Sequence, residues 1–310
     1  MSRPEKPSAS TRHPAPENLT RFAWLSIAAA IVTIGLKGAA WWVTDSVGLL
    51  SDAAESTVNL VAAVVALMAL RVAMRPPDRK HNYGHSKAEY FSAAVEGLMI
   101  FVAAAVILVA SIERFLNPAP LENVGVGLAI SVVASVINGT VAWVLLRAGS
   151  RHRSITLTAD GKHLLTDVWT SVGVVAGVLL VWLTGWERLD PLVAFAVGIN
   201  ILVTGWNLVR ASAAGLMDVS LPKEDNDRLR EIVTRFTSED VHFHAFRTRE
   251  SGHRRFMEMH LLVPGQWTVQ RGHDLAEDIT DALLEAYPDL RVSMHLEPIE
   301  DPRSYEDIGI

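Results

Sequence analysis

Long apolar runs fill the first two thirds of the chain. A transmembrane helix needs about 20 consecutive, mostly apolar residues. Six runs fit this description, at about 22–43, 47–74, 90–112, 124–146, 155–183 and 191–209. The pattern therefore predicts an α-helical membrane domain of six transmembrane helices over residues 21–215, with both chain termini on the same side of the bilayer.

The last third of the chain has a different pattern. Helical periodicity covers 224–236 and 271–287, and alternating apolar and polar residues predict strands at 241–249, 256–263 and 290–296. The order αββαβ predicts a small α+β domain over residues 216–310, with helices on one face of a sheet. Residues 1–20, rich in Pro and Ser, are expected to form a disordered tail.

Charge and composition narrow the class of protein. The net charge is −6 and no dense basic cluster is present, so nucleic acid is not an expected partner. The chain has no Cys, so any metal must be bound by His, Asp, Glu, Asn or backbone groups. The short loops that share a side with the amino terminus hold most of the loop Lys and Arg residues: Arg75, Arg79, Lys80, Arg147, Arg151 and Arg153. This bias predicts that both termini are cytoplasmic.

Two polar runs interrupt the apolar spans. The second and fifth spans each carry polar residues at i, i+3 and i+7, which project from one helix face: Asp52, Glu55 and Asn59, then Asp160, His163 and Asp167. An ionisable group at mid-membrane costs about 2.5–3.5 kcal/mol unless it is compensated. A divalent cation held between the two faces would compensate these groups, whereas hydrogen bonding between helices would explain one such residue but hardly both runs.

The types of ligand atom limit which metal ion could bind between the two spans. One imidazole nitrogen with oxygen donors suits a tetrahedral site for Zn²⁺, and also for Co²⁺, Fe²⁺, Mn²⁺ or Cd²⁺. An imidazole titrates near physiological pH and must be neutral to bind a metal, so His163 can exchange a proton for a metal ion.

These motifs resemble those of a known family. The segment Ser51-Asp52-Ala-Ala-Glu55-Ser-Thr-Val-Asn59, the segment His163-Leu-Leu-Thr-Asp167, the loop between the second and third spans and the His-rich tail resemble the cation diffusion facilitator (CDF) transporters. The resemblance extends from about residue 20 to the end of the chain. It implies a homodimer in the inner (plasma) membrane that exchanges Zn²⁺ or a related divalent metal for protons.

The resemblance also implies which residues bind metal. The transport site would comprise Glu55, Asn59, His163 and Asp167, with Asp52 and Asp160 one turn away as supporting or gating residues. A loop site would use Asp78, His81 and His85. A cytoplasmic-domain site would use His244, His260, His273, His295 and Glu297, and a charge pair of Lys87 with Asp218 would link the domains. Family members more commonly have Asp or His at position 55 and Asp at positions 59 and 297.

Simpler interpretations of these residues remain open. His81 and His85 are four residues apart and can chelate a metal ion if they continue a helical turn, but residues 78–85 also fit a solvated, basic cytoplasmic loop. Strand histidines are often exposed polar positions, which is our interpretation of His242 and His253. A Lys–Asp pair at the surface contributes only about 0–1 kcal/mol.

The sequence thus predicts a divalent metal/proton antiporter that exports Zn²⁺ or a related transition metal from the cytoplasm. An exporter selective for Fe²⁺ or Mn²⁺ is an alternative, as is a membrane-anchored metal sensor without transport. An intramembrane metalloenzyme would also place His and carboxylates in the spans. No His-Glu-x-x-His run is present, however, and Asn adds no general base, so we do not expect an enzyme.

Overall fold

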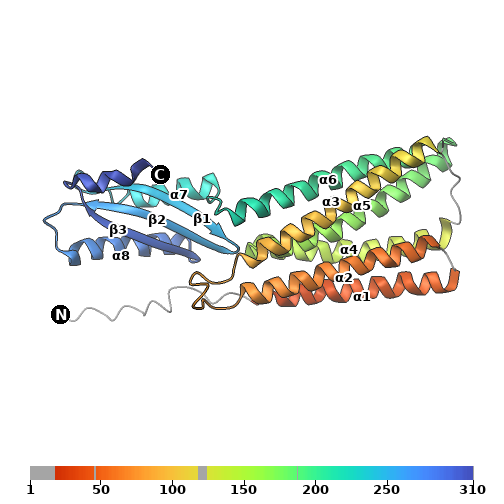
Figure 1. Ribbon diagram of the computed structural model, residues 1–310, viewed down its shortest axis with the longest axis horizontal. Coiled ribbons are helices and arrows are strands. Elements are labelled where there is room, and N and C mark those ends of the chain that lie inside the picture. Colours follow the sequence, from red (N-terminus) through yellow and green to blue (C-terminus); the bar gives the residue numbers. More distant parts are fainter. Residues whose placement is uncertain (1–17, 45–46, 118–123, 187, 310) are drawn as a thin grey trace. The chain divides into compact units, whose positions relative to one another are not determined.

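The chain folds into two compact units. The computed structural model describes residues 18–44, 47–117, 124–186 and 188–309 (Figure 1). One unit runs from Asn18 to Ala214, and the other begins at Gly215.

The first unit is built from six long helices. They are α1 (Thr20–Thr44), α2 (Val47–Ala73), α3 (Ala88–Leu116), α4 (Val124–His152), α5 (Ile155–Thr184) and α6 (Leu189–Leu216). Within the described ranges, segments of α1, α3, α4 and α6 are long and apolar enough to cross a membrane on length and composition alone. The helices α2 and α5 are as long, with 27 and 30 residues, but they carry the polar runs that lower their hydropathy.

The start of α1 corrects the expected extent of the disordered tail. The side chain of Asn18 accepts a hydrogen bond from the Thr20 amide at 3.1 Å, and Leu19 is buried. This Asn capping satisfies a free amide of the first helical turn, so residues 18–20 belong to the ordered start of α1 and not to a disordered tail. Residues 1–17 of the expected tail lie outside the described part of the chain.

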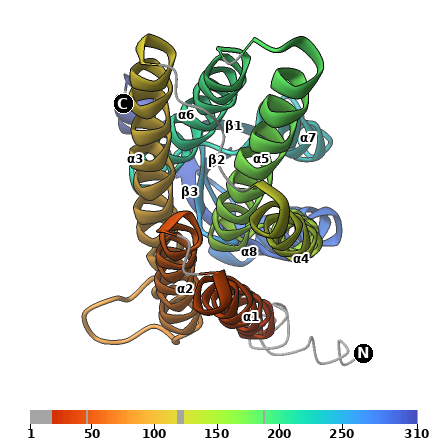
Figure 2. The same ribbon diagram turned by 90° about the vertical axis from the view of Figure 1, so that its right-hand side faces the viewer.

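The helix α5 is central to the first unit. It contacts α1, α2, α3 and α4, and the end-on view in Figure 2 shows α5 next to α4. The helix α3 also packs closely against α6, because Gly97 of α3 and Gly205 of α6 leave no side chain between the two backbones. Small residues permit this approach in membrane helices. The arrangement places the polar face of α5 among α2, α3 and α4.

The second unit is an α+β domain with the expected element order. It contains α7 (Lys223–Thr234), β1 (His242–Ser251), β2 (Arg254–Val263), α8 (Val269–Ala286) and β3 (Leu290–Pro298). The sheet has the order β1-β2-β3, in which β2 pairs antiparallel with β1 and parallel with β3. A short 3₁₀ helix, η2 (Pro302–Gly309), follows β3 and was not predicted from the sequence.

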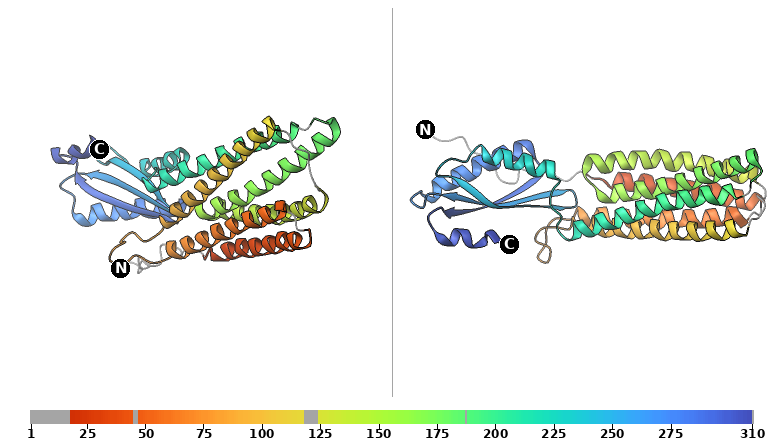
Figure 3. Two further views of the ribbon diagram at one scale, coloured as in Figure 1. Left: turned by 45° about the vertical axis from the view of Figure 1, so that its right-hand side comes forward. Right: turned by 90° about the horizontal axis from the view of Figure 1, so that it is seen from above.

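The two faces of this sheet have different roles. Alternate residues of β2, namely Met257, Met259 and Leu261, are buried in a core with residues of α7 and α8. Side chains alternate between faces along a strand, so His260 lies on the opposite face. Figure 3 (right) shows α7 and α8 on one side of the sheet and η2 on the other. The His-bearing face is therefore the one that the two long helices leave uncovered.

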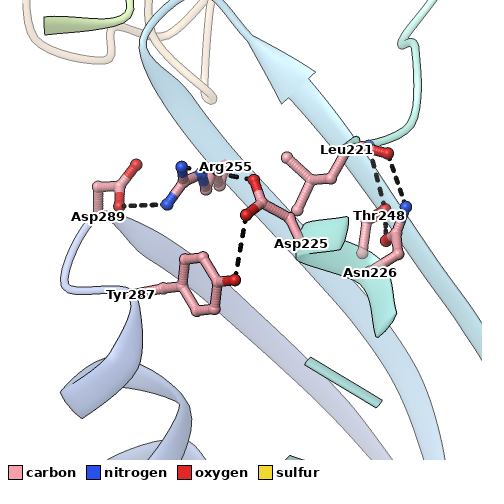
Figure 4. A network of polar contacts seen from close by, with 7 residues as sticks. All are labelled: Leu221, Asp225, Asn226, Thr248, Arg255, Tyr287 and Asp289. Atoms are coloured by element: carbon pink, nitrogen blue, oxygen red, sulfur yellow. Dashed lines mark hydrogen bonds and ion pairs between the residues drawn. The ribbon is translucent and has the colours of Figure 1, made fainter. Parts of the chain in front are cut away.

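A polar network joins α7 to the sheet (Figure 4). Arg255 of β2 forms ion pairs with Asp225 at 3.5 Å and with Asp289 at 3.3 Å. The Tyr287 hydroxyl donates to Asp225 at 3.1 Å. Nearby, Asn226 donates to the Leu221 carbonyl at 2.7 Å. These contacts hold the start of α7 against the sheet.

Candidate metal sites

The polar groups of α2, α4 and α5 meet at Asp167. The side-chain amide of Asn59 donates a short hydrogen bond to Asp167 Oδ2, and the amide of Asn138 donates to the same oxygen at 3.2 Å. Asn59 and His163 are 4% and 5% exposed, which places both inside the helical unit. The expected convergence of Asn59 with Asp167 is thus observed.

His163 differs from Asn59, Asn138 and Asp167 in its hydrogen bonding. Among the described residues, neither of its ring nitrogens has a hydrogen-bond partner. Buried polar groups nearly always have a partner, so each exception needs an explanation. A cavity of about 460 Å³ lies beside the ring, lined by Asn59, His163, Thr166, Asp167, Thr170 and apolar residues of α3. The imidazole thus has a free nitrogen at the edge of a space large enough for a hydrated ion.

Of the other residues expected at or near this site, only Asp160 has a described side chain. Asp52 and Glu55 lie in α2, but their side chains are outside the described part of the chain. Asp160 is buried, and its Oδ1 accepts a hydrogen bond from Ser26 of α1 at 3.0 Å. Asn138 was not identified as a site residue from the sequence. Its signal was a polar amide in the otherwise apolar fourth span, the same signal that identified Asn59.

The loop between α2 and α3 brings Asp78, His81 and His85 together. Asp78 carboxylate oxygens lie 3.1 Å from His81 Nδ1 and 3.3 Å from His85 Nε2. The backbone amides of Lys80 and His81 donate to Asp78 at 2.8 and 2.7 Å, and these bonds lower the pKa of its carboxyl group. The expected chelating group therefore forms, with ligand atoms within 4.8 Å of one another.

A turn, and not a continued helix, produces this loop geometry. The Gly84 amide donates to the His81 carbonyl at 2.9 Å, and Gly84 has a φ of +89°, a conformation that favours glycine. The turn brings the His81 and His85 rings to 4.5 Å between centroids. The condition that we set from spacing alone, a helical turn, was too narrow.

Three histidines form a row across the sheet of the second unit. His244 pairs with His260 in the β1–β2 register, and His260 pairs with His295 in the β2–β3 register. Their ring centroids are 5.0 and 5.2 Å apart. Residues directly opposite one another in neighbouring strands project from the same face. The row therefore lies on the face away from α7 and α8.

Glu297 completes the group on this face. Its carboxylate oxygens lie 2.9 Å from His244 Nε2 and 3.1 Å from His260 Nδ1. These three side chains are 12–21% exposed, and their ligand atoms fall within 4.8 Å of one another. The other nitrogen of His244, Nδ1, has no hydrogen-bond partner among the described residues. Two imidazoles and a carboxylate suit Zn²⁺ and similar ions.

The remaining expected residues of the second unit do not all join this group. His295 belongs to the row but is not among the three residues with clustered ligand atoms. His273 is exposed on α8, which packs on the opposite face of the sheet, so within one chain it does not reach the group. Asp218 accepts a hydrogen bond from Arg249 at 3.1 Å. Its pairing with Lys87 remains a prediction.

The segment after β3 lies next to this metal group. Tyr305 of η2 has its ring 6.0 Å from that of His244, and its hydroxyl donates to the Ile299 carbonyl at 2.9 Å. Ser304 is buried and donates to the Pro298 carbonyl. The 3₁₀ helix thus covers one edge of the His row.

Comparison with known proteins accounts for both units. Residues 23–217 match the model of the cation efflux transmembrane domain, and residues 221–299 match that of the cytoplasmic domain of cation efflux proteins. The chain belongs to the cation efflux family, the CDF transporters. The two matches confirm the resemblance found in the motifs. This CDF protein is therefore a membrane transporter for cations and not an enzyme.

Two relatives cover nearly all of this CDF chain. The uncharacterized transporter sll1263 of Synechocystis sp. is 52% identical over 285 residues, which are 92% of each chain. The cation-efflux pump FieF of Salmonella arizonae is 29% identical over 284 residues, 90% of this chain and 93% of the relative.

Solved structures match the cytoplasmic part of the transporter. A structure of CzrB in its zinc form is 33% identical and covers 26% of this chain and 91% of that chain, with a TM-score of 0.25. The metal-bound C-terminal domain of the CzcD transporter from Thermotoga maritima is 28% identical and covers 26% and 99%, with a TM-score of 0.24.

Proposed function

We propose that this CDF transporter exports Zn²⁺ or a related divalent transition metal from the cytoplasm in exchange for protons. The observation that supports this most is the buried imidazole of His163, which has no hydrogen-bond partner among the described residues and lines a cavity together with Asn59 and Asp167. The names of FieF, a cation-efflux pump, and of CzrB in its zinc form point in the same direction.

The donor set explains how metal and proton would compete. A metal ion at this site would take a nitrogen of His163 and oxygens of Asp167 and Asn59, with Glu55 as the further expected ligand. Metal binding requires a neutral imidazole, so a proton on His163 and a metal ion exclude each other. The hydrogen bonds from Asn59 and Asn138 orient the Asp167 carboxylate.

Loop charge supports the direction of transport. Lys and Arg residues cluster in the loops on the side of the amino terminus, which favours cytoplasmic termini in an inner membrane. In that orientation the group of His244, His260 and Glu297 samples cytoplasmic metal. We propose that metal binding there favours a homodimer competent for transport, which agrees with the match to the cytoplasmic domain of cation efflux proteins.

A flux assay tests the proposed function. The protein is reconstituted in liposomes that contain a pH-sensitive dye, and Zn²⁺, Mn²⁺, Fe²⁺, Co²⁺ and Cd²⁺ are presented in turn. We expect metal entry with opposite proton movement for at least Zn²⁺, lost in His163→Ala and kept in Thr140→Ala, which alters an exposed hydroxyl of α4. Metal binding without flux would favour the membrane-anchored sensor, and undiminished coupling in His163→Ala would refute the mechanism.

A further inference from the structure

Two carboxyl groups outside the metal ligand set are fully buried in the helical unit. Glu96 of α3 is 0% exposed and Asp160 of α5 is 1% exposed. Each has one oxygen bound to a serine: Ser92 donates to Glu96 Oε1 at 3.1 Å, and Ser26 of α1 donates to Asp160 Oδ1 at 3.0 Å. The Ser26 bond joins α1 to α5, and neither Glu96 nor Asp160 is among the expected metal ligands.

The second oxygen of each carboxyl group is not satisfied. Glu96 Oε2 and Asp160 Oδ2 are both buried and have no hydrogen-bond partner among the described residues. No described Lys or Arg forms an ion pair with either group. Ala93 of α3, one turn before Glu96, and Ala159 of α5, next to Asp160, are buried in the same apolar cluster, so both carboxyl groups lie where α3 and α5 pack together. Among the described residues, the second oxygen of each carboxyl group therefore has neither a hydrogen-bond donor nor an ion-pair partner.

Other charged and titratable positions around the pair are few. On α3, Glu89 is bound by Ser154, and on α6, Arg210 is exposed. On α5, Lys162 is half-buried and His163 is the next titratable group. The neighbouring helix α4 carries Arg147 and His152 towards its end, and the side chains of Asp52 and Glu55 on α2 lie outside the described part of the chain.

A bound proton supplies what the pair lacks. In a membrane interior, polar groups must find partners within the protein because water is absent. Two carboxylates close together in such a site cannot both remain ionised, and a shared proton is the usual solution in proteins. A shared proton removes one negative charge. It also supplies an O–H donor for the carboxyl oxygens that have no other donor among the described residues.

We propose that Glu96 and Asp160 together bind a single proton and form a proton site separate from the metal ligands. This inference rests on the proposed antiport for its role in transport, but proton binding itself does not depend on it. Asp160 precedes His163 by three residues and shares its helix face. A movement of α5 that changes access to His163 therefore also moves one half of the proton site.

Infrared spectroscopy of the full-length protein tests proton binding directly. A buried carboxylic acid has a carbonyl stretch that a carboxylate lacks, and the band shifts in D₂O. We expect this band in the wild type at neutral pH, lost in Glu96→Gln and in Asp160→Asn, and retained in Glu113→Gln, which changes an exposed carboxyl group of the same α3. Absence of the band at neutral pH, or its persistence in both pair variants, would overturn the proposal.

The flux assay separates this proposal from the antiport. We expect Glu96→Gln and Asp160→Asn to transport metal down its own gradient but to move fewer protons per metal ion than the wild type. An unchanged proton-to-metal ratio would overturn the role in coupling. If the wild type moves metal without protons, the antiport is wrong, and the infrared band alone decides whether the pair binds a proton. Should the variants not fold, the pH titration of the wild-type band still gives that answer.

Discussion

Asn138 carries no charge, yet its amide donates to Asp167, the carboxylate at the centre of the proposed transport site. Residues that orient a metal ligand typically change metal affinity 10–100-fold when they are removed. We therefore expect Asn138→Ala to weaken metal binding about tenfold, because Asp167 loses one of its two amide donors. Isothermal titration with Zn²⁺ measures this, and Thr140→Ala on the exposed face of α4 is the matched control. Equal affinities in the two variants would contradict the assignment.

Asp78 gives a prediction about pH. Backbone amides of His81 and Lys80 lower the pKa of its carboxyl group, so the folded loop favours the charged form. The charge therefore stabilises the loop above the ordinary Asp pKa of about 3.9, and this stabilisation is lost as the pH falls through the lower pKa of the folded state. When the pH is lowered, we expect the amide resonances of Lys80 and His81 to keep their neutral-pH positions until the pH is below the ordinary pKa of an Asp carboxyl group.

The variant Asp78→Asn checks the cause of this behaviour. It keeps the shape of the side chain but removes the charge, so the same two amide resonances should move at neutral pH and then show no further change in acid. Asp240→Asn, at an exposed position of the second unit, is the control and should leave them unchanged. Resonances that titrate alike in Asp78→Asn and the wild type would show that another group controls the loop.

At the scale of elements, the contact of α3 with α6 depends on glycine. A Cβ atom at Gly205 would lie 2.9 Å from the backbone nitrogen of Phe101, whereas one at Gly35 of α1 would meet nothing within 4 Å. Overpacking typically costs about 1–3 kcal/mol. We expect Gly205→Ala to lower the thermal unfolding temperature in detergent, and Gly35→Ala to leave it unchanged or raise it slightly. Similar temperatures for both variants would show that the helices separate freely.

Sequence periodicity was sufficient for the elements but not for their contacts. Apolar runs located all six long helices, and alternation located the three strands, because these patterns are local. Two features depend on register, which no local pattern contains. One is the alignment of His244, His260 and His295 across three strands. The other is the meeting of Asn138 with Asp167. The helix η2 escaped prediction because Pro302–Gly309 is short and polar and is held by contacts with residues 298–301.

For the proposed transport site as well, the sequence was sufficient to identify residues but not their contacts. Polar and ionisable residues in an apolar helix need partners, which identified Asn59, His163 and Asp167 before their contacts were known. The same argument applies to Glu96, the one charged residue of its span, but only the fold shows that its helix α3 packs against α5, which carries Asp160. A single polar residue in a span has many potential partners, and the helix packing selects one.

At the scale of the whole molecule, each unit of the transporter has its own group of potential metal ligands, so metal binding in the second unit can be measured apart from transport. A ligand that binds only the folded state stabilises it by about 2.7 kcal/mol when present at 100 times its Kd, which corresponds to a factor of about 100. We therefore expect Zn²⁺ at such an excess to slow hydrogen exchange in β2 up to about 100-fold, since β2 supplies His260 and lies at the centre of the sheet.

Glu297 decides whether this protection arises at the predicted group. Glu297→Gln removes the carboxylate charge between His244 and His260, so most of the protection by Zn²⁺ should disappear. Glu258→Gln changes an exposed carboxylate on the same face of β2 and should retain it. Because the exchange of individual peptides is followed in the intact chain, a change in the membrane helices does not obscure the result. Equal protection in both variants would place the metal elsewhere and would remove the basis for regulation by cytoplasmic metal.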